Sequence, residues 1–386
     1  MRRIPDIPVY LDYNATTPVA AEVVAAMAPF WMEQYHNPSS PYPEAARVRA
    51  AVEDARAAVA ALLGAESDTI VFTSGGTESD HWALEAGVAF WRGTRRKVIA
   101  SAVEHPAVTE TLRWLESQGA EVVQVPTDEH GVIRLDILDQ CLDPSTAMVS
   151  VMLANNEVGT RQPIEEVARR AHAVGALVHT DAAQAVGKIA VDVRALDVDL
   201  LTVVGHKFYA PKGIGALYIR RGLDLPAGLP GGGQEGGRRS GTENVPAIVG
   251  LGKAARLAAT WLACGGPQTQ AALRDELQAR LTQAIPKSRI LGEGAPRLGN
   301  TLALVLPGLI GMRVLQACTT LRAATGSACH SNESGGSKTL QSMGIPPEWA
   351  QGFIRLSLGR ETTAAMMDRA AMSLISTIQT MYSEGE

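Results

Sequence analysis

The chain has 386 residues, 46% of them hydrophobic and 19% charged, and its formal net charge is −5. This composition is typical of a globular protein and excludes a nucleic-acid-binding protein that depends on overall basicity. The N-terminal segment lacks the apolar core of a signal peptide, and no stretch approaches the roughly 18 apolar residues of a membrane span. The four cysteines have no metal-ligand spacing and are too few for a disulfide framework, so we expect a cytoplasmic protein with no metal site.

Helical segments alternate with short runs rich in Val, Ile and Thr. Two segments near the N-terminus, 25–35 and 44–65, have helical composition, and Gly64 is a stop signal for the second. The expected strands then follow in the order 68–74, 97–103, 121–127, 147–156, 177–182 and 199–205. Short buried strands separated by helices predict an α/β fold with a mostly parallel sheet.

A glycine-rich stretch, residues 225–246, interrupts this alternation, and a long Ala/Leu helix begins near Ile248. Beyond about residue 260 the pattern becomes mixed, with strands expected at 300–308 and 353–359. We therefore predict a large α/β domain over residues 15–258 and a smaller α+β domain formed by residues 1–14 and 259–386.

Polar residues follow the first expected strand directly. In TSGGTESDHWAL (73–84), Gly76 and Thr77 stand where a helix should begin. Free backbone N–H groups, a hydroxyl and the helix dipole would suit an anion at that point. A simple helix cap explains the same residues, so this motif alone leaves both interpretations open.

Asp181 and Lys207 each end an expected strand and are 26 residues apart. Taken singly, Asp181 is explained as a helix cap, Lys207 as a lysine that surfaces at a strand end, and His105 as a structural histidine. Together with the anion cradle, they match what pyridoxal 5'-phosphate requires: a lysine for a Schiff base, a carboxylate for the pyridine nitrogen and donors for the phosphate. Ligands of an open parallel sheet gather at the carboxyl ends of its strands, and we expect the cofactor there.

Segments along most of the chain carry a family resemblance. In order from about residue 9 to residue 362, they are YLDYNATTP, NPSSPY, VFTSGGTES, VEH, LANNEVG, VHTDAAQAVGK, GHKFYAPKGIGALYIRR, GGGQE, RSGTEN, GSACHS and IRLSLGR. Together they resemble the cysteine desulfurase family of the class V aminotransferase group. The resemblance implies a fold type I transferase that depends on pyridoxal 5'-phosphate, with a seven-stranded, mostly parallel sheet, and it implies a homodimer.

The resemblance also implies roles for individual residues. Lys207 would form the Schiff base with the cofactor, Asp181 would pair with the pyridine nitrogen, and His105 would stack on the ring and transfer protons. Gln184 and Asn156 would lie near the ring hydroxyl, with Asn156 also beside the substrate.

Two further groups of residues are assigned in the same way. Gly76, Thr77 and His206 would hold the phosphate, with Thr242 reaching in from the neighbouring subunit. Arg355 would bind the substrate carboxylate, because a guanidinium fork suits a bidentate carboxylate.

Cys329 lies in GSACHSNESGG (326–336), among small and polar residues. Structural cysteines are usually interior, whereas reactive ones lie in partly exposed, polar surroundings, although a loop cysteine of no consequence is the plainer explanation of this pattern. The resemblance implies that the Cys329 thiolate takes the sulfur of L-cysteine as a persulfide, for delivery to an unidentified acceptor protein, while the substrate leaves as L-alanine. Iron–sulfur cluster assembly is one of several pathways that use such persulfides.

Some positions depart from the family pattern. Val204 stands where many relatives have a phosphate-binding serine, and Thr202 is a candidate substitute. His81 stands where asparagine is common, and we expect it to be a structural helix residue.

Three alternative functions stay open. The ACHS loop is closer to selenocysteine lyases, which release selenium and L-alanine from L-selenocysteine. Another pyridoxal phosphate aminotransferase would not need Cys329. A non-catalytic scaffold would typically have lost Lys207 or Asp181, and both are present.

Overall fold

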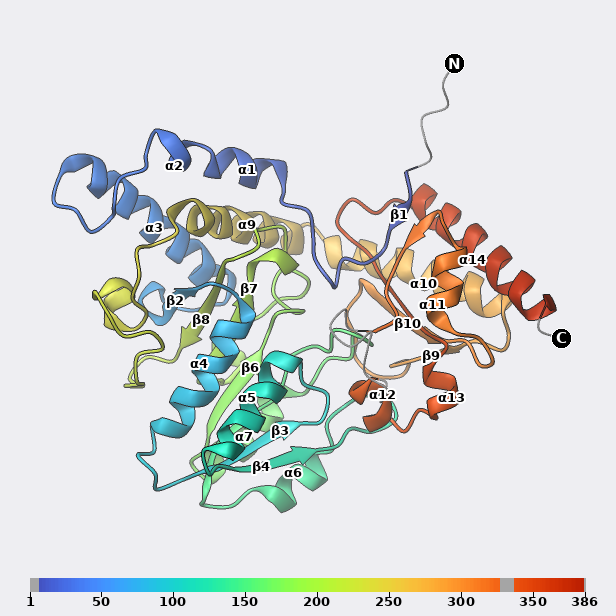
Figure 1. The fold of residues 1–386 in the computed structure, drawn as a ribbon, viewed down its shortest axis with the longest axis horizontal. Helices are drawn as coiled ribbons and strands as arrows, with labels where there is room; N and C mark the ends of the chain where they lie inside the picture. Colours follow the sequence, from blue (N-terminus) through green and yellow to red (C-terminus); the bar gives the residue numbers. More distant parts are fainter. Residues whose placement is uncertain (1–6, 327–336, 385–386) are drawn as a thin grey trace.

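The computed structural model describes residues 7–326 and 337–384 (Figure 1). A seven-stranded sheet has the strand order β2–β8–β7–β6–β5–β3–β4. Its strands are β2 (Ile70–Thr73), β3 (Lys97–Ser101), β4 (Glu121–Val125), β5 (Thr146–Ser150), β6 (Leu177–Asp181), β7 (Leu200–Val204) and β8 (Gly215–Ile219). Neighbours pair in parallel, except that β8 runs antiparallel to both β2 and β7. The predicted α/β fold with a mostly parallel, seven-stranded sheet is confirmed.

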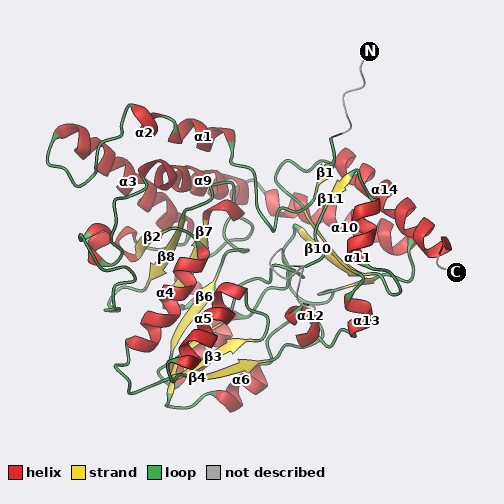
Figure 2. Ribbon diagram, in the orientation of Figure 1, coloured by secondary structure: helices red, strands yellow, loops and turns green. Residues whose placement is uncertain are grey.

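Helices cover both faces of this sheet (Figure 2). On β2, Ile70 and Phe72 belong to a hydrophobic cluster with residues of α3 (Pro43–Leu62) and α9 (Val245–Ala263). Val71 points the other way and belongs to a cluster with residues of α4 (Gly76–Ala89) and α5 (Pro106–Ser117). The alternation follows from the two-residue period of a strand, and burial on both faces explains why these strands are apolar throughout. The helices of this part are α3 (Pro43–Leu62), α4 (Gly76–Ala89), α5 (Pro106–Ser117), α6 (Leu135–Cys141), α7 (Ile164–Ala173), α8 (Val193–Leu196) and α9 (Val245–Ala263), with short 3-10 turns η1 (Ser67–Thr69), η2 (Gly205–Lys207) and η3 (Gln234–Gly237).

The N-terminal helical segment differs from the prediction. Instead of one helix over residues 25–35, the chain forms α1 (Ala21–Met27) and α2 (Pro29–Met32), which meet at Ala28. Proline lacks a backbone N–H and suits only the first turn of a helix, so Pro29 begins a new one. The next prediction is confirmed, because α3 ends just before Gly64, whose φ is 64°.

The C-terminal part is built on smaller sheets. β10 (Thr301–Val305) pairs antiparallel with β12 (Phe353–Ser357) and with β9 (Arg289–Ile290), and β1 (Val9–Tyr10) pairs in parallel with β11 (Leu321–Arg322). The strands expected at 300–308 and 353–359 are thus confirmed. The helices here are α10 (Gly266–Ala284), α11 (Gly311–Ala317), α12 (Lys338–Ser342), α13 (Pro347–Ala350) and α14 (Ala364–Glu384). The predicted domain boundary at residue 258 falls inside α9, and the division into two domains stays a prediction.

Within residues 7–326 and 337–384, no single helix is both long enough and apolar enough to cross a membrane. Only α9 and α10 taken as a pair, bent by 68°, reach that length and composition.

Candidate active site

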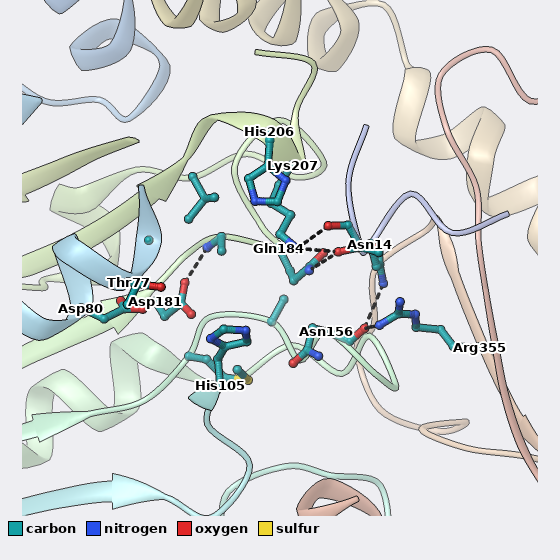
Figure 3. Close-up of a pocket in the computed structure, with 16 residues that line it drawn as sticks. Asn14, Thr77, Asp80, His105, Asn156, Asp181, Gln184, His206, Lys207 and Arg355 are labelled. Carbon is teal, nitrogen blue, oxygen red and sulfur yellow. Dashed lines mark hydrogen bonds between the residues drawn. The ribbon is translucent and has the colours of Figure 1, made fainter. Parts of the chain in front are cut away.

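A cavity of about 270 Å³ lies at the carboxyl ends of the parallel strands (Figure 3). It is lined by Asn14, Ala15, Gly76, Thr77, Asp80, His105, Met152, Ala154, Asn156, Asp181, Ala183, Gln184, Val204, His206, Lys207 and Arg355. Parallel strands place the residues that follow them at one edge of the sheet, so segments far apart in sequence converge here. Nine of the eleven residues predicted for the site line this one cavity.

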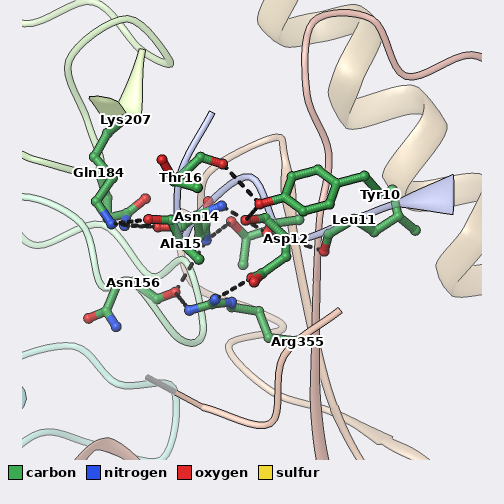
Figure 4. Close-up of polar contacts among 12 residues, drawn as sticks. Tyr10, Leu11, Asp12, Asn14, Ala15, Thr16, Asn156, Gln184, Lys207 and Arg355 are labelled. Carbon is green, nitrogen blue, oxygen red and sulfur yellow. Dashed lines mark hydrogen bonds and ion pairs between the residues drawn. The ribbon is translucent and has the colours of Figure 1, made fainter. Parts of the chain in front are cut away.

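Lys207 is carried into the cavity by the η2 turn that follows β7. Its Nζ donates hydrogen bonds to the carbonyl oxygens of Asn14, at 2.8 Å, and Ala15, at 2.9 Å (Figure 4). Both acceptors belong to the segment just after β1, and they hold the amine at the cavity wall. An amine in this position is available to a carbonyl compound bound in the cavity.

Asp181 ends β6, and its Oδ1 accepts a hydrogen bond of 2.8 Å from the backbone N–H of Ala183. Burial raises the pKa of Asp181, while His105, the Ala183 N–H and Lys207 act in the opposite direction. Asp80 lines the same cavity, and burial together with the charge of Asp181 raises its pKa well above the usual range. Since Lys207 is a cationic partner of Asp181 but not of Asp80, we assign the proton to Asp80 and the negative charge to Asp181.

His105 precedes α5 and serves as its N-cap, because its Nδ1 accepts a hydrogen bond of 3.1 Å from the backbone N–H of Ala107. A nitrogen that accepts this bond carries no proton, so the neutral ring holds its proton on Nε2. The cap fixes the ring while it lines the cavity. The structural and functional interpretations of His105 are therefore compatible.

The N-terminus of α4 forms the end of the cavity that suits an anion. Gly76 and Thr77 begin this helix, whose first N–H groups have no carbonyl partner within it. A Cβ on Gly76 would lie 2.6 Å from Cγ2 of Val204, so only glycine leaves the cradle undistorted. His206 lines the same cavity, and burial lowers its pKa to about 4, which makes it a neutral hydrogen-bond partner near pH 7.

Thr202 does not take the place of the serine that Val204 replaces. Its side chain is buried, and its Oγ1 lies 3.1 Å from Nε2 of His179, beside Asp80 rather than in the cavity. Val204, which lines the cavity, therefore offers no hydroxyl there, and Thr202 supplies none in its place. The side chain of His81 points to α5 instead, 3.2 Å from the Thr111 hydroxyl, as expected for a structural residue.

Arg355 enters from β12, on the opposite side of the cavity from Asp181, and is 2% exposed. Its Nη2 lies 2.7 Å from Oδ1 of Asp12, and its Nη1 donates to the carbonyl of Asn156 at 2.9 Å. Its buried Nε has no hydrogen-bond partner among residues 7–326 and 337–384. A buried guanidinium with a free donor is suited to bind a carboxylate.

Two polar residues of the cavity, Asn14 and Asp80, had not been predicted. Asn14 lies in YLDYNATTP, four residues beyond the end of β1 at Tyr10. Asp80 follows Thr77 by three residues on α4, which places both on one helix face.

Two of the predicted residues are not placed in the cavity. Thr242 is exposed and does not line the cavity of its own chain, and its assignment to a neighbouring subunit stays a prediction. Cys329 lies outside the described residues.

The residues of the cavity fit pyridoxal 5'-phosphate. An amine, a buried carboxylate and a helix N-terminus with a glycine cradle occupy separate parts of one cavity. These are the partners needed by the aldehyde, the pyridine nitrogen and the phosphate. Asp181 would hold the nitrogen end, Gly76, Thr77 and His206 the phosphate end, and Lys207 the aldehyde.

A family model described as aminotransferase class-V matches residues 9–369. The chain is 44% identical over 364 residues to cysteine desulfurase IscS of Methanosarcina thermophila, covering 94% of this chain and 89% of that protein. It is 45% identical over 363 residues to cysteine desulfurase 2 of Trichormus variabilis, covering 94% and 90%. A solved structure of a NifS-like protein superposes with a TM-score of 0.89 at 35% identity, covering 98% of this chain and 100% of that one.

Proposed function

The chain belongs to the aminotransferase class-V family, and we propose that it is a pyridoxal 5'-phosphate-dependent cysteine desulfurase that converts L-cysteine to L-alanine. Relatives named cysteine desulfurases cover 94% of the chain at 44–45% identity. The observation that carries the proposal is the single cavity in which Lys207, Asp181 and Arg355 meet. A lysine, a buried carboxylate and a carboxylate-binding arginine are the groups that pyridoxal-dependent chemistry on an amino acid requires.

When bound, pyridoxal 5'-phosphate supplies an electron sink for negative charge at the substrate Cα. Arg355 lines the cavity and binds the substrate carboxylate through its guanidinium, and so fixes which end of the amino acid faces Lys207. The Lys207 amine takes the Cα proton, because it is a basic group that lines the cavity and is held at its wall by the carbonyls of Asn14 and Ala15. His105 holds a proton on Nε2 and serves the substrate thiol and Cβ.

Cys329 is proposed as the sulfur carrier. Its thiolate attacks the sulfur of the substrate, the electron pair of the Cβ–S bond stays on Cβ, and Cβ takes a proton. The products are L-alanine and a persulfide on Cys329, and an acceptor thiol then removes the terminal sulfur. Atoms and electrons balance without a further oxidant or reductant.

The remaining assignments are also proposals. Thr242 is exposed and 35 residues beyond Lys207 in sequence, which supports its service to the site of a second subunit in a homodimer. We further propose a cytoplasmic location, residues 15–258 as the cofactor-binding domain, and a protein as the sulfur acceptor.

The test is alanine release from L-cysteine and from L-selenocysteine, measured for the parent protein and for Cys329→Ala. The matched control is Cys264→Ala, since Cys264 is an exposed cysteine outside the cavity. We expect the parent and the control to release alanine from L-cysteine and Cys329→Ala to release almost none. Alanine release from L-selenocysteine that is orders of magnitude faster than from L-cysteine, with almost none from L-cysteine, would contradict the desulfurase proposal. It would favour a selenocysteine lyase.

A further inference from the structure

A second lysine, Lys188, lies next to the candidate site without lining its cavity. It stands in the loop after β6, four residues beyond Gln184, and is largely buried. Its Nζ donates hydrogen bonds to Oε1 of Gln184, at 2.5 Å, and to Oδ1 of Asn14, at 2.8 Å. The mechanism above uses neither the amine nor these contacts.

The two acceptors of the Lys188 amine are amide oxygens that carry no charge. Burial lowers the pKa of the amine well below the usual range, and the charges of Lys207 and Arg355 act in the same direction. Tyr13, Tyr209 and Arg360 line a small cavity beside it and offer no anionic partner near pH 7. The amine donates to both amide oxygens whether or not it carries a charge.

The contacts of Lys188 determine how the amide of Gln184 is turned. A lysine amine donates through its N–H groups, so Oε1 of Gln184 must face Lys188. Nε2 then faces the other way and donates to the carbonyl oxygen of Asn14 at 3.0 Å. A flipped amide would set two oxygens against each other at Asn14 and two N–H groups against each other at Lys188.

Asn14 is held in a matching way. Its Oδ1 also accepts a hydrogen bond of 3.0 Å from Nδ2 of Asn300, and its Nδ2 donates to the carbonyl of Asn156 and to the Thr301 hydroxyl. The side chain is 1% exposed, and each of its polar atoms is paired. Asn14 is therefore a rigid partner, and its carbonyl oxygen accepts from both Gln184 and Lys207.

We propose that Lys188 is a positioning residue that fixes Gln184 as a hydrogen-bond donor toward the oxygen on the cofactor ring. The inference rests on the proposed function, in which Gln184 lies near that oxygen. A donor there stabilises negative charge on the ring oxygen. The nitrogen that would link Lys207 to the cofactor, called the Lys207 linkage, then holds its proton less tightly. Lys188 thereby lowers the pH at which this linkage gains and loses its proton.

The test uses the protein loaded with pyridoxal 5'-phosphate and follows its visible absorption band as a function of pH. In Lys188→Met, the side chain keeps its length but loses both donors. We expect the pH midpoint of the band to rise by about one unit, because one hydrogen bond to the charged form is lost. Lys188→Gln retains one donor group, and we expect a smaller rise in the same direction.

A double-mutant cycle with Gln184→Leu identifies the route of the effect. Gln184→Leu alone should raise the midpoint as Lys188→Met does, and Lys188→Met should add nothing in that background. An equal further rise in the double variant would mean that Lys188 acts directly on the linkage, and this would overturn the proposal. Should Lys188→Met fail to fold, Lys188→Gln takes its place in the cycle.

The controls separate this inference from the proposed function. Lys97→Met removes a lysine at the start of β3, away from the cavity, whose Nζ lies 2.5 Å from Oδ2 of Asp143. This variant should leave the pH midpoint of the band unchanged. A parent protein without a visible band or alanine release would end the proposed function itself. A normal parent beside a folded Lys188→Met with an unchanged midpoint would end only the inference about Lys188.

Discussion

The Nζ of Lys207 lies 2.8 Å from the carbonyl oxygen of Asn14, although the two residues are 193 positions apart. The contact brings the segment that follows β1 against the turn that follows β7 (Figure 4). Asn14 in turn contacts Asn300 and Thr301 next to and within β10. The reactive amine is thus held by a backbone segment that joins the seven-stranded sheet to the smaller C-terminal sheets.

Lys207→Ala should abolish turnover and remove the visible band of the bound cofactor, because no other residue in the cavity offers an amine. The measurements are alanine release and an absorption spectrum of the purified protein. Lys212→Ala is the matched control, since Lys212 is an exposed lysine five residues further along the same segment. Normal turnover in Lys207→Ala would contradict the assigned role.

Arg355→Lys should raise KM for L-cysteine by about 10- to 100-fold, with a smaller effect on kcat. An ammonium cannot donate to Asp12, the Asn156 carbonyl and a substrate carboxylate in the fixed directions of a guanidinium. Steady-state kinetics over a range of L-cysteine concentrations measures the effect. Arg289→Lys, at an exposed position on β9 two strands from β12, should leave KM unchanged. A fall in kcat at unchanged KM would place Arg355 outside substrate binding.

Glu104→Gln should make the stability of the protein less dependent on pH. Burial raises the pKa of Glu104 to about 8, although the Ser101 hydroxyl and the Met152 N–H act against this. A folded-state pKa above the unfolded value of 4.5 means that the folded protein binds the extra proton. Its contribution to the free energy of unfolding is therefore complete below about pH 4.5 and is lost as the pH rises toward 8.

The loss is on the order of a few kcal/mol for a buried carboxyl with this shift. Urea unfolding of the parent and of Glu104→Gln between pH 5 and pH 8 measures it. The two curves should diverge as the pH rises, with the variant more stable at pH 8. Glu116→Gln, at an exposed position on α5, should follow the parent. Parallel curves for the parent and Glu104→Gln would show that Glu104 titrates normally.

Glu235→Gln should destabilise the protein by about 2–4 kcal/mol. Glu235 pairs with Arg56 through two hydrogen bonds, of 2.7 and 2.9 Å, and its Oε2 also accepts from the backbone N–H of Phe72. The Arg56 side chain is buried in α3, so removing the carboxylate leaves a charge with only the exposed Glu53 beside it. Denaturant unfolding measures the change.

The control for this pair is Glu110→Gln, which removes the partner of Arg113 at the protein surface. Surface ion pairs contribute about 0–1 kcal/mol, so this variant should unfold close to the parent. Equal, small effects of Glu235→Gln and Glu110→Gln would show that the buried pair does not hold the 231–244 segment to α3.

The sequence determined the parts of this protein that depend on local pattern. Short apolar runs between helical segments predict the parallel sheet, because burial on both faces leaves strands without polar alternation. Asp181 and Lys207 could be singled out because each directly follows such a run, and strand ends of a parallel sheet share one edge. Proline at position 29 was a local signal too, and it ends one helix and begins another where a single helix had been predicted.

Only the tertiary structure decided which groups meet across long stretches of chain. The carbonyl of Asn14 against Lys207, the amine of Lys188 against Asn14, and the engagement of Thr202 by His179 are contacts that periodicity and residue type do not encode. Thr202 and Val204 lie on the same face of β7, next to Gly76, and only the folded sheet decided that the Thr202 hydroxyl is engaged by His179. A hydrogen bond is a matter of distance and direction between two atoms, and for residues in different strands or loops the folded chain alone sets both.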